Sequence, residues 1–146
     1  LLEASEGEVN IAVIFSDQVL NVYDAGNPTD ENMQQLYDKI SRHECVGGTD
    51  IYLAAEEALS YLEQYDLSAY TPAVILMTDG ESNGSHSMED LKSAYQDGGY
   101  DVPIFSILFG EAYEEELQEI ADLTNGRVSD GREDLVGAFR SVKGYN

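Results

Sequence analysis

The stretch Ala73-Val74-Ile75-Leu76-Met77-Thr78-Asp79-Gly80 decides the fold. Its apolar residues follow one another without alternating with polar ones, a pattern typical of a parallel strand covered on both faces. Asp79-Gly80 then ends the strand in a turn. Open α/β sheets bind ligands beyond the carboxyl ends of their strands, so the Asp79 carboxylate stands where a ligand is expected.

A second turn, Gly47-Gly48-Thr49-Asp50, opens an apolar helix. The hydroxyl of Thr49 and the carboxylate of Asp79 are hard oxygen donors, which suit a cation such as Mg²⁺. Two donors are too few to hold the ion well, so the two turns predict half of a metal site. The alternative is local: Thr49 or Asp50 caps the helix, and Asp79-Gly80 is only a turn.

The chain before these turns predicts a hairpin and two helices. Residues 9–15 form a nearly continuous β-branched and apolar run, which predicts a buried strand. A gap of three residues leads to a second strand over 19–23, the spacing of an antiparallel edge strand. Helical spacing begins at Asp30, a predicted N-cap, and a second helix begins near Thr49 or Asp50.

The chain after Gly80 alternates helices and strands. Ser87 and Asp90 have the spacing of a capping box, which predicts a helix closed by Gly98-Gly99. The remaining elements are a strand over 102–109, a helix over 117–124, a short strand over 127–129 and a helix over 135–142. We therefore predict one α/β domain over residues 1–146, a three-layer doubly wound sheet that is mostly parallel with one antiparallel edge strand.

Composition limits the partners. The formal net charge of -22, from 29 acidic and 7 basic residues, repels nucleic acid and anionic lipid and attracts cations. No stretch of sequence approaches the roughly 18 apolar residues of a membrane span. Cys45 is the one cysteine in the sequence, so an internal disulfide is excluded and the compartment stays open. Our expectation is an extracytoplasmic or cell-surface part of a larger bacterial protein.

Three segments together resemble the von Willebrand factor A domain family: Gly47-Gly48-Thr49-Asp50, Val74 to Gly80, and Ile107-Leu108-Phe109-Gly110. The resemblance covers the whole chain. It implies a metal-ion-dependent adhesion site (MIDAS) at the upper edge of the sheet, where Thr49 and Asp79 bind Mg²⁺ or Mn²⁺ directly or through water. It also implies that a carboxylate from a partner protein fills the vacant coordination position, in a domain that binds proteins and is not an enzyme.

The sequence departs from the family pattern at its start. Family members open with a strand ending in Asp-x-Ser-x-Ser, which supplies three of the usual ligands, and that segment is not in this sequence. Leu1 to Ser5 resembles the last turn of the following helix, so we expect a domain that lacks its first central strand and most of its first helix. The missing strand would leave a slot between 9–15 and 73–78. We expect the slot to be filled by direct pairing of the two strands, by a second chain through self-association or strand exchange, or by a separate segment.

Other polar residues and two other functions stay open. Asp17, Glu81, Ser82 and Glu111 follow strands that end at the same edge, although each also fits a solvated loop. His43 and His86 are lone histidines in polar surroundings, and Cys45 has no basic neighbour in sequence to activate its thiol, so we expect no catalytic role for them. The loop from Asp79 to Asp90 has the oxygen spacing of an EF-hand Ca²⁺ loop, but an apolar strand precedes it where a helix is required. A hydrolase using Asp79 or Ser82 is the other alternative, without a Gly-x-Ser-x-Gly elbow to support it.

Overall fold

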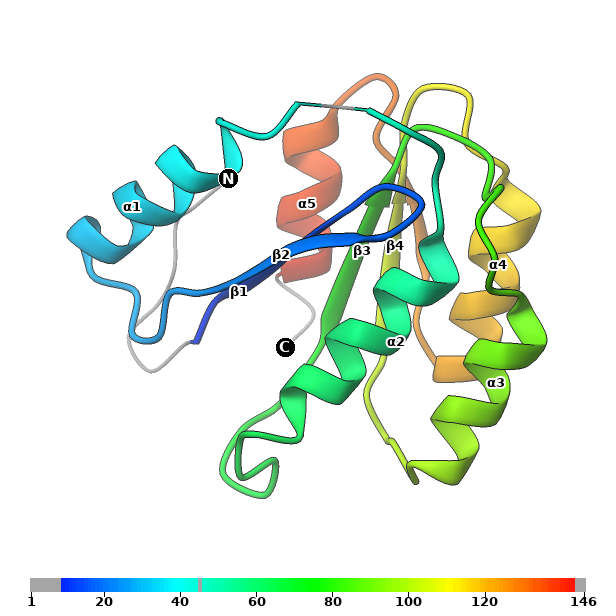
Figure 1. Ribbon diagram of the computed structural model, residues 1–146, viewed down its shortest axis with the longest axis horizontal. Coiled ribbons are helices and arrows are strands. Elements are labelled where there is room, and N and C mark those ends of the chain that lie inside the picture. The colour runs from blue at the N-terminus through cyan, green and yellow to red at the C-terminus, as the bar shows by residue number, and fades with distance from the viewer. Residues whose placement is uncertain (1–8, 45, 144–146) are drawn as a thin grey trace.

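A computed structural model describes residues 9–44 and 46–143 of the chain. In this part the chain forms an alternating series of strands and helices (Figure 1). The strands are β1 (Ile11–Phe15), β2 (Val19–Asp24), β3 (Val74–Thr78), β4 (Ile104–Leu108) and β5 (Val128–Asp130). The helices are α1 (Asp30–Ile40), α2 (Ile51–Leu62), α3 (Met88–Asp97), α4 (Glu114–Thr124) and α5 (Leu135–Lys143). The order of elements agrees with the prediction from hydrophobic periodicity.

The described strands belong to two sheets. β3, β4 and β5 form a parallel sheet in that order, and β1 and β2 form an antiparallel hairpin. The α/β class, the parallel sheet and an antiparallel pair of strands are confirmed, although the pair forms a sheet of its own in the described residues. Direct pairing of β1 with β3, one expected way of filling the slot, is wrong for the described residues, because the two strands lie in different sheets.

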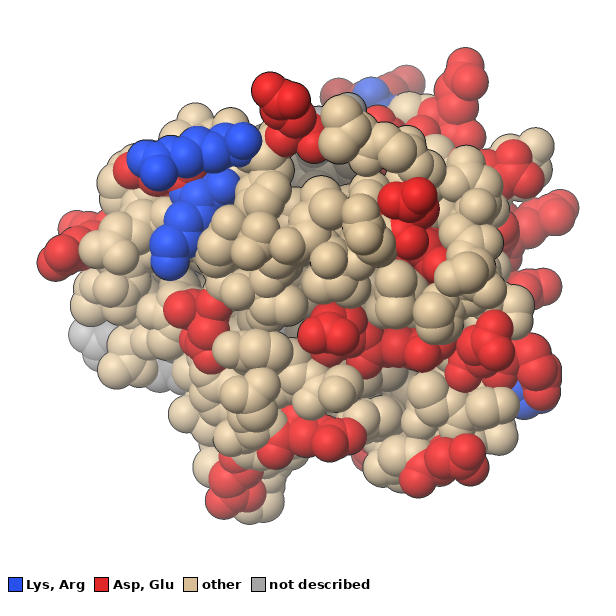
Figure 2. Space-filling view, viewed as in Figure 1, with Lys and Arg blue, Asp and Glu red and all other residues tan. Residues whose placement is uncertain are grey.

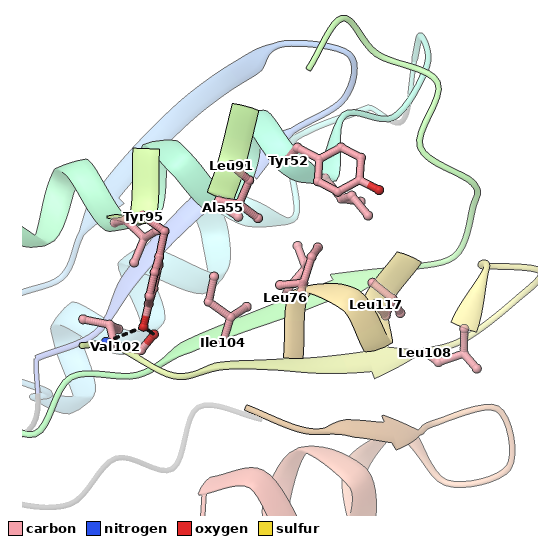
Figure 3. Close-up of a cluster of buried hydrophobic side chains, with 12 residues drawn as sticks. Tyr52, Ala55, Leu76, Leu91, Tyr95, Val102, Ile104, Leu108 and Leu117 are labelled. Atoms are coloured by element: carbon pink, nitrogen blue, oxygen red, sulfur yellow. Dashed lines mark hydrogen bonds between the residues drawn. The ribbon is translucent and has the colours of Figure 1, made fainter. Parts of the chain in front are cut away.

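Helices cover the parallel sheet on both faces. On one face, α2, α3 and α4 bury Ala55, Leu91 and Leu117 against Leu76 and Ile104 (Figure 3). On the other face, Val142 of α5 packs with Phe105 and Ile107 of β4. Alternate β4 side chains therefore enter opposite cores, as the pleat of a strand requires. This arrangement explains why all residues of β4 are buried.

The hairpin differs from the sequence prediction in burial. Every residue of β1 is half-buried, although its sequence predicts a strand covered on both faces. In the described structure β1 contacts β2 and α2, whereas α5 packs on β4 and β5. An apolar strand with fewer neighbours keeps part of its surface exposed, so the prediction of a fully buried strand at 9–15 is wrong.

Local signals set the helix ends, with small corrections. The capping box of α3 is confirmed, because Ser87 accepts from the Asp90 amide and Asp90 accepts from the Ser87 amide. For α1 the N-cap is Thr29, whose hydroxyl accepts from the Asn32 amide at 3.2 Å, and Asp30 is the first helical residue. The positive end of the helix dipole stabilises the Asp30 carboxylate in the first turn. Aspartate is therefore expected at this position as well as at the N-cap, and the sequence does not distinguish the two.

Candidate functional site

Four loops meet at the carboxyl edge of the strands, in the upper part of Figure 1. They are the β1–β2 turn, the segment 47–50 before α2, the β3–α3 loop and the β4–α4 loop. Backbone hydrogen bonds join them: the Asp50 amide donates to the Ser16 carbonyl at 2.7 Å, and the Glu111 amide donates to the Asp79 carbonyl at 3.0 Å. We call this surface the rim.

The rim brings together the two turns that carry the sequence-predicted donors. Asp79 directly follows β3 and is exposed, while Thr49 is half-buried and directly precedes the first turn of α2. A Cβ atom built on Gly80 would lie 3.7 Å from the Thr49 hydroxyl oxygen. The Thr49 hydroxyl therefore lies against the Asp79-Gly80 turn, at the edge where open sheets bind ligands.

Gly110 lets the β4–α4 loop approach Asp79 closely. It has a φ of +61°, and a Cβ atom at this position would lie 2.8 Å from the Asp79 carbonyl oxygen. A side chain would therefore clash with the backbone and strain the turn. The requirement explains why the Ile107-Leu108-Phe109-Gly110 segment ends in glycine.

The other polar residues named from the sequence lie on the rim in different roles. A Cβ atom on Gly47 would lie 3.0 Å from Asp17 Oδ1, which places Asp17 beside the segment 47–50. The Ser82 amide donates to Glu116 Oε2 of α4 at 3.0 Å. Glu81 and Glu111 are exposed. Glu116 and Asn83 contribute contacts that sequence analysis missed, because their partners are more than 30 positions away.

Asp50 is a structural residue of the rim. Its carboxylate is fully buried and caps α2 by accepting from the Leu53 amide at 2.9 Å. It also accepts from the amides of Ser85 at 2.9 Å and His86 at 3.0 Å. These bonds satisfy the buried charge and tie the β3–α3 loop to the start of α2. The capping interpretation is thus confirmed for Asp50.

His86 lies near the end of the β3–α3 loop, beside α2. Its Nδ1 lies 3.3 Å from Asp50 Oδ2, and its Nε2 lies 4.0 Å from Glu56 Oε2. Burial raises the pKa of Glu56 above its usual range, with smaller contributions from Asp90 and Asp50, while His86 acts in the opposite direction. The cluster therefore links His86 of the β3–α3 loop to the carboxylate that caps α2 and to a carboxylate within α2.

The structure argues against the EF-hand alternative and gives the Ser82 hydroxyl two backbone contacts. β3 precedes Asp79 where an EF-hand requires a helix, and the Asp90 carboxylate accepts from Ser87 in the capping box. The Ser82 hydroxyl lies 3.5 Å from the Thr49 carbonyl and 3.4 Å from the Ile51 amide. These contacts give Asp90 and Ser82 structural partners within the described residues.

Acidic side chains are scattered over the face drawn in Figure 2 and outnumber the basic ones there. Beside the β4–α4 loop lies an open hollow of about 630 Å³ whose lining includes Glu111, Glu114 and Glu115. Arg132 also lines it and donates to both Asp130 oxygens, which lowers the pKa of Asp130 to about 2. Acidic walls raise the local concentration of cations at the rim.

These features define an open α/β sheet domain with four loops gathered at the carboxyl edge of the strands. The sequence model of the family "von Willebrand factor type A domain" matches residues 2–136 of the chain. The chain belongs to this family, whose members are protein-interaction and adhesion modules.

Known relatives agree with this assignment. Calcium-activated chloride channel regulator 1 of Bos taurus is 31% identical over 110 residues, which cover 75% of this chain. The chain matches 12% of the length of that protein. The solved structure of von Willebrand factor type A from Catenulispora acidiphila matches with a TM-score of 0.76 and 18% identity over 95% of this chain and 33% of that chain. At this identity the likeness shows the fold.

A second similar solved structure is that of a zinc-bound protein. Proximal thread matrix protein 1 from the mussel byssus, described as having a zinc-occupied MIDAS motif, matches with a TM-score of 0.58 and 23% identity. The match covers 91% of this chain and 33% of that chain. In the described residues of our protein, no helix is long and apolar enough to span a bilayer.

Proposed function

We propose that the rim binds a partner protein through a divalent metal ion, with Thr49 and Asp79 as metal donors. The observation that carries this proposal is the approach of the Thr49 hydroxyl to the Asp79-Gly80 turn. When bound, the ion supplies the positive charge that a partner carboxylate needs. We infer that the domain acts by binding and not by catalysis.

The donor chemistry favours Mg²⁺ or Mn²⁺. An alcohol and a carboxylate are hard oxygen ligands, and Mg²⁺ is ordinarily held by a few carboxylates together with water and ligand oxygens. The zinc-occupied motif of the mussel protein supports a divalent ion in this fold. The choice of Mg²⁺ or Mn²⁺ for our protein rests on its own oxygen donors.

Two donors alone predict weak binding. Within residues 9–44 and 46–143, no three His, Cys, Asp or Glu side chains are grouped so as to hold a metal. We propose that the other coordination positions belong to water, to the partner and to an Asp-x-Ser-x-Ser segment of the kind found in the family. The affinity of residues 1–146 alone for Mg²⁺ is then low, because Mg²⁺ gives up its hydration water reluctantly.

Titration of the chain with Mn²⁺, followed by the electron paramagnetic resonance signal of the free ion, tests the metal site. A weak site is expected that loses at least about tenfold in affinity in Asp79→Asn and in Thr49→Val. Asp97→Asn removes an exposed charge at the end of α3 and is the matched control for nonspecific attraction. Equal affinity in Asp79→Asn and Asp97→Asn would overturn the proposal.

Supplying the family segment sharpens the test. Fusing a strand that ends in Asp-x-Ser-x-Ser ahead of Leu1 is expected to raise Mg²⁺ affinity, measured by calorimetry. The same affinity with and without the added segment would count against the MIDAS assignment. Acidic partners and a cell-surface location are consistent with the family and form part of the proposal, and the net charge of -22 disfavours nucleic acid.

A further inference from the structure

Asn83 holds the Thr49 backbone on both sides. The Thr49 backbone amide donates to the side-chain Oδ1 of Asn83 at 2.8 Å. The Asn83 backbone amide donates to the Thr49 carbonyl at 2.7 Å. The two bonds fix the amide and the carbonyl of one residue against a loop that lies 34 positions further along the chain. Thr49 therefore has little freedom to rotate away from the β3–α3 loop.

Gly48 makes room for this contact. A Cβ atom on Gly48 would lie 2.3 Å from Asn83 Oδ1, far inside normal contact distance. Any side chain at position 48 must displace the side-chain carboxamide of Asn83. The glycine before Thr49 thus serves the Asn83 contact, in addition to the turn that it forms.

Asp50 fixes the other end of the same loop. Its carboxylate accepts from the amides of Ser85 and His86, and a Cβ atom on Gly84 would lie 2.2 Å from Asp50 Oδ2. Asn83 and Asp50 together bind the β3–α3 loop to the segment that carries Thr49. The Asp50 carboxylate is fully buried, whereas Asn83 is exposed, so Asn83 can be replaced without opening the core.

We propose that Asn83 is a positioning residue that holds the Thr49 hydroxyl beside Asp79. The inference rests on the proposed function only in taking Thr49 and Asp79 as metal donors. Donors must be held within about 0.5 Å of their working geometry to be effective. A hydroxyl on an unsupported loop cannot meet this requirement, and Asn83 contacts the backbone of Thr49 itself.

Amide hydrogen exchange in the full metal-free chain tests the positioning directly. Asn83→Ala is expected to speed exchange of the Thr49 amide at least about tenfold. The variant is also expected to weaken the nuclear Overhauser contacts between Thr49 side-chain protons and the Gly80 α protons. Gly48→Ala keeps Asn83 but displaces its side-chain carboxamide, so it is expected to have the same effect. Asn83→Asp keeps an acceptor oxygen and is expected to restore slow exchange.

Asn32→Ala is the matched control, because Asn32 is another asparagine whose side chain hydrogen-bonds the backbone: its Nδ2 donates to the Asn27 carbonyl from a half-buried position of α1. It is expected to leave Thr49 exchange unchanged. Unchanged exchange and unchanged Thr49–Gly80 contacts in both Asn83→Ala and Gly48→Ala would overturn the proposal. Equal acceleration of all amides in Asn83→Ala would also overturn it, since it would indicate a general stabilising role.

Mn²⁺ titration separates this proposal from the proposed function. If Asn83 positions a metal donor, Asn83→Ala and Gly48→Ala are expected to lower Mn²⁺ affinity about tenfold without changing the Asp79 ligand. Affinity lost in Asp79→Asn but kept in both Asn83→Ala and Gly48→Ala would overturn the positioning role and leave the metal site intact. Affinity unaffected by Asp79→Asn would reject the metal site, while the exchange experiment would still decide the Thr49 geometry.

Discussion

β1 and β4 have similar sequences and different surroundings. Ile11–Phe15 reads IAVIF and Ile104–Leu108 reads IFSIL. Every residue of β4 is buried, because strands lie on both its edges and helices on both its faces. Every residue of β1 is half-buried, and among the described strands it pairs with β2 alone. The burial of a strand is therefore a property of its neighbours as much as of its own side chains.

Matched truncations of the two strands should show the largest effect. Ile107→Ala removes a fully buried side chain between β4 and α5 and is expected to cost about 3 to 5 kcal/mol. Ile14→Ala makes the same chemical change at a half-buried position of β1 and is expected to cost about 1 to 2 kcal/mol. Urea unfolding measures the loss in free energy of unfolding for both variants. Equal losses would contradict the expected difference between β4 and β1.

Amide hydrogen exchange in the unsubstituted chain should be faster in the hairpin than in the parallel sheet. Amides of β4 are expected to exchange through global unfolding, because the strand is paired on both edges. Amides of β1 are expected to exchange roughly 100-fold faster, through local opening of the hairpin. Exchange at one common rate in β1 and β4 would indicate that the hairpin and the parallel sheet open as one unit.

Removing a polar contact beside β4 should destabilise the protein more than removing one in the hairpin region. Thr124 is buried and accepts from the Ile104 amide at 3.0 Å, so Thr124→Val leaves a buried donor without its partner and is expected to cost about 1 to 3 kcal/mol. Tyr23→Phe removes the hydroxyl that lies 2.7 Å from His43 Nε2 in the hairpin region. Its expected cost is about 1 kcal/mol or less. Thermal unfolding checks the order, and a larger loss in Tyr23→Phe would contradict it.

The smallest expected effect depends on pH and concerns α2, the helix that contacts both sheets. Burial raises the pKa of Glu56, and Glu56 Oε1 is buried without a hydrogen-bond partner in the described structure. A raised pKa means that the folded state favours the neutral carboxyl. The resulting stability is present below the unfolded pKa and is lost as the pH rises through the folded pKa.

Glu56→Gln should therefore be more stable than the natural chain at pH 7, by about 1 kcal/mol or less, and the difference should shrink toward pH 4. Glu57→Gln on the same helix makes the same charge change and is the control. Urea unfolding across this pH range measures the difference. A gain that is equal at pH 4 and pH 7 would exclude ionisation of Glu56 as its cause.

Local sequence patterns determined the elements and two candidate donors of this protein. Hydrophobic periodicity located the strands and helices, and the Ser87–Asp90 spacing located the capping box, because these signals lie within a few residues of one another. Thr49 and Asp79 were found from the turns that carry them, since turn residues and strand ends are visible in sequence. Their assignment as metal ligands stays a prediction.

Tertiary structure alone decided the division into two sheets, the partial exposure of β1 and the roles of Asp50 and Asn83. Each depends on contacts between distant parts of the chain, such as the 34 positions that separate Thr49 from Asn83. Asp and Asn in a polar loop look the same in sequence whether water or a backbone amide is their partner. Packing of the helices on the sheet brings the two loops together, and only that approach gives Asn83 a partner in Thr49.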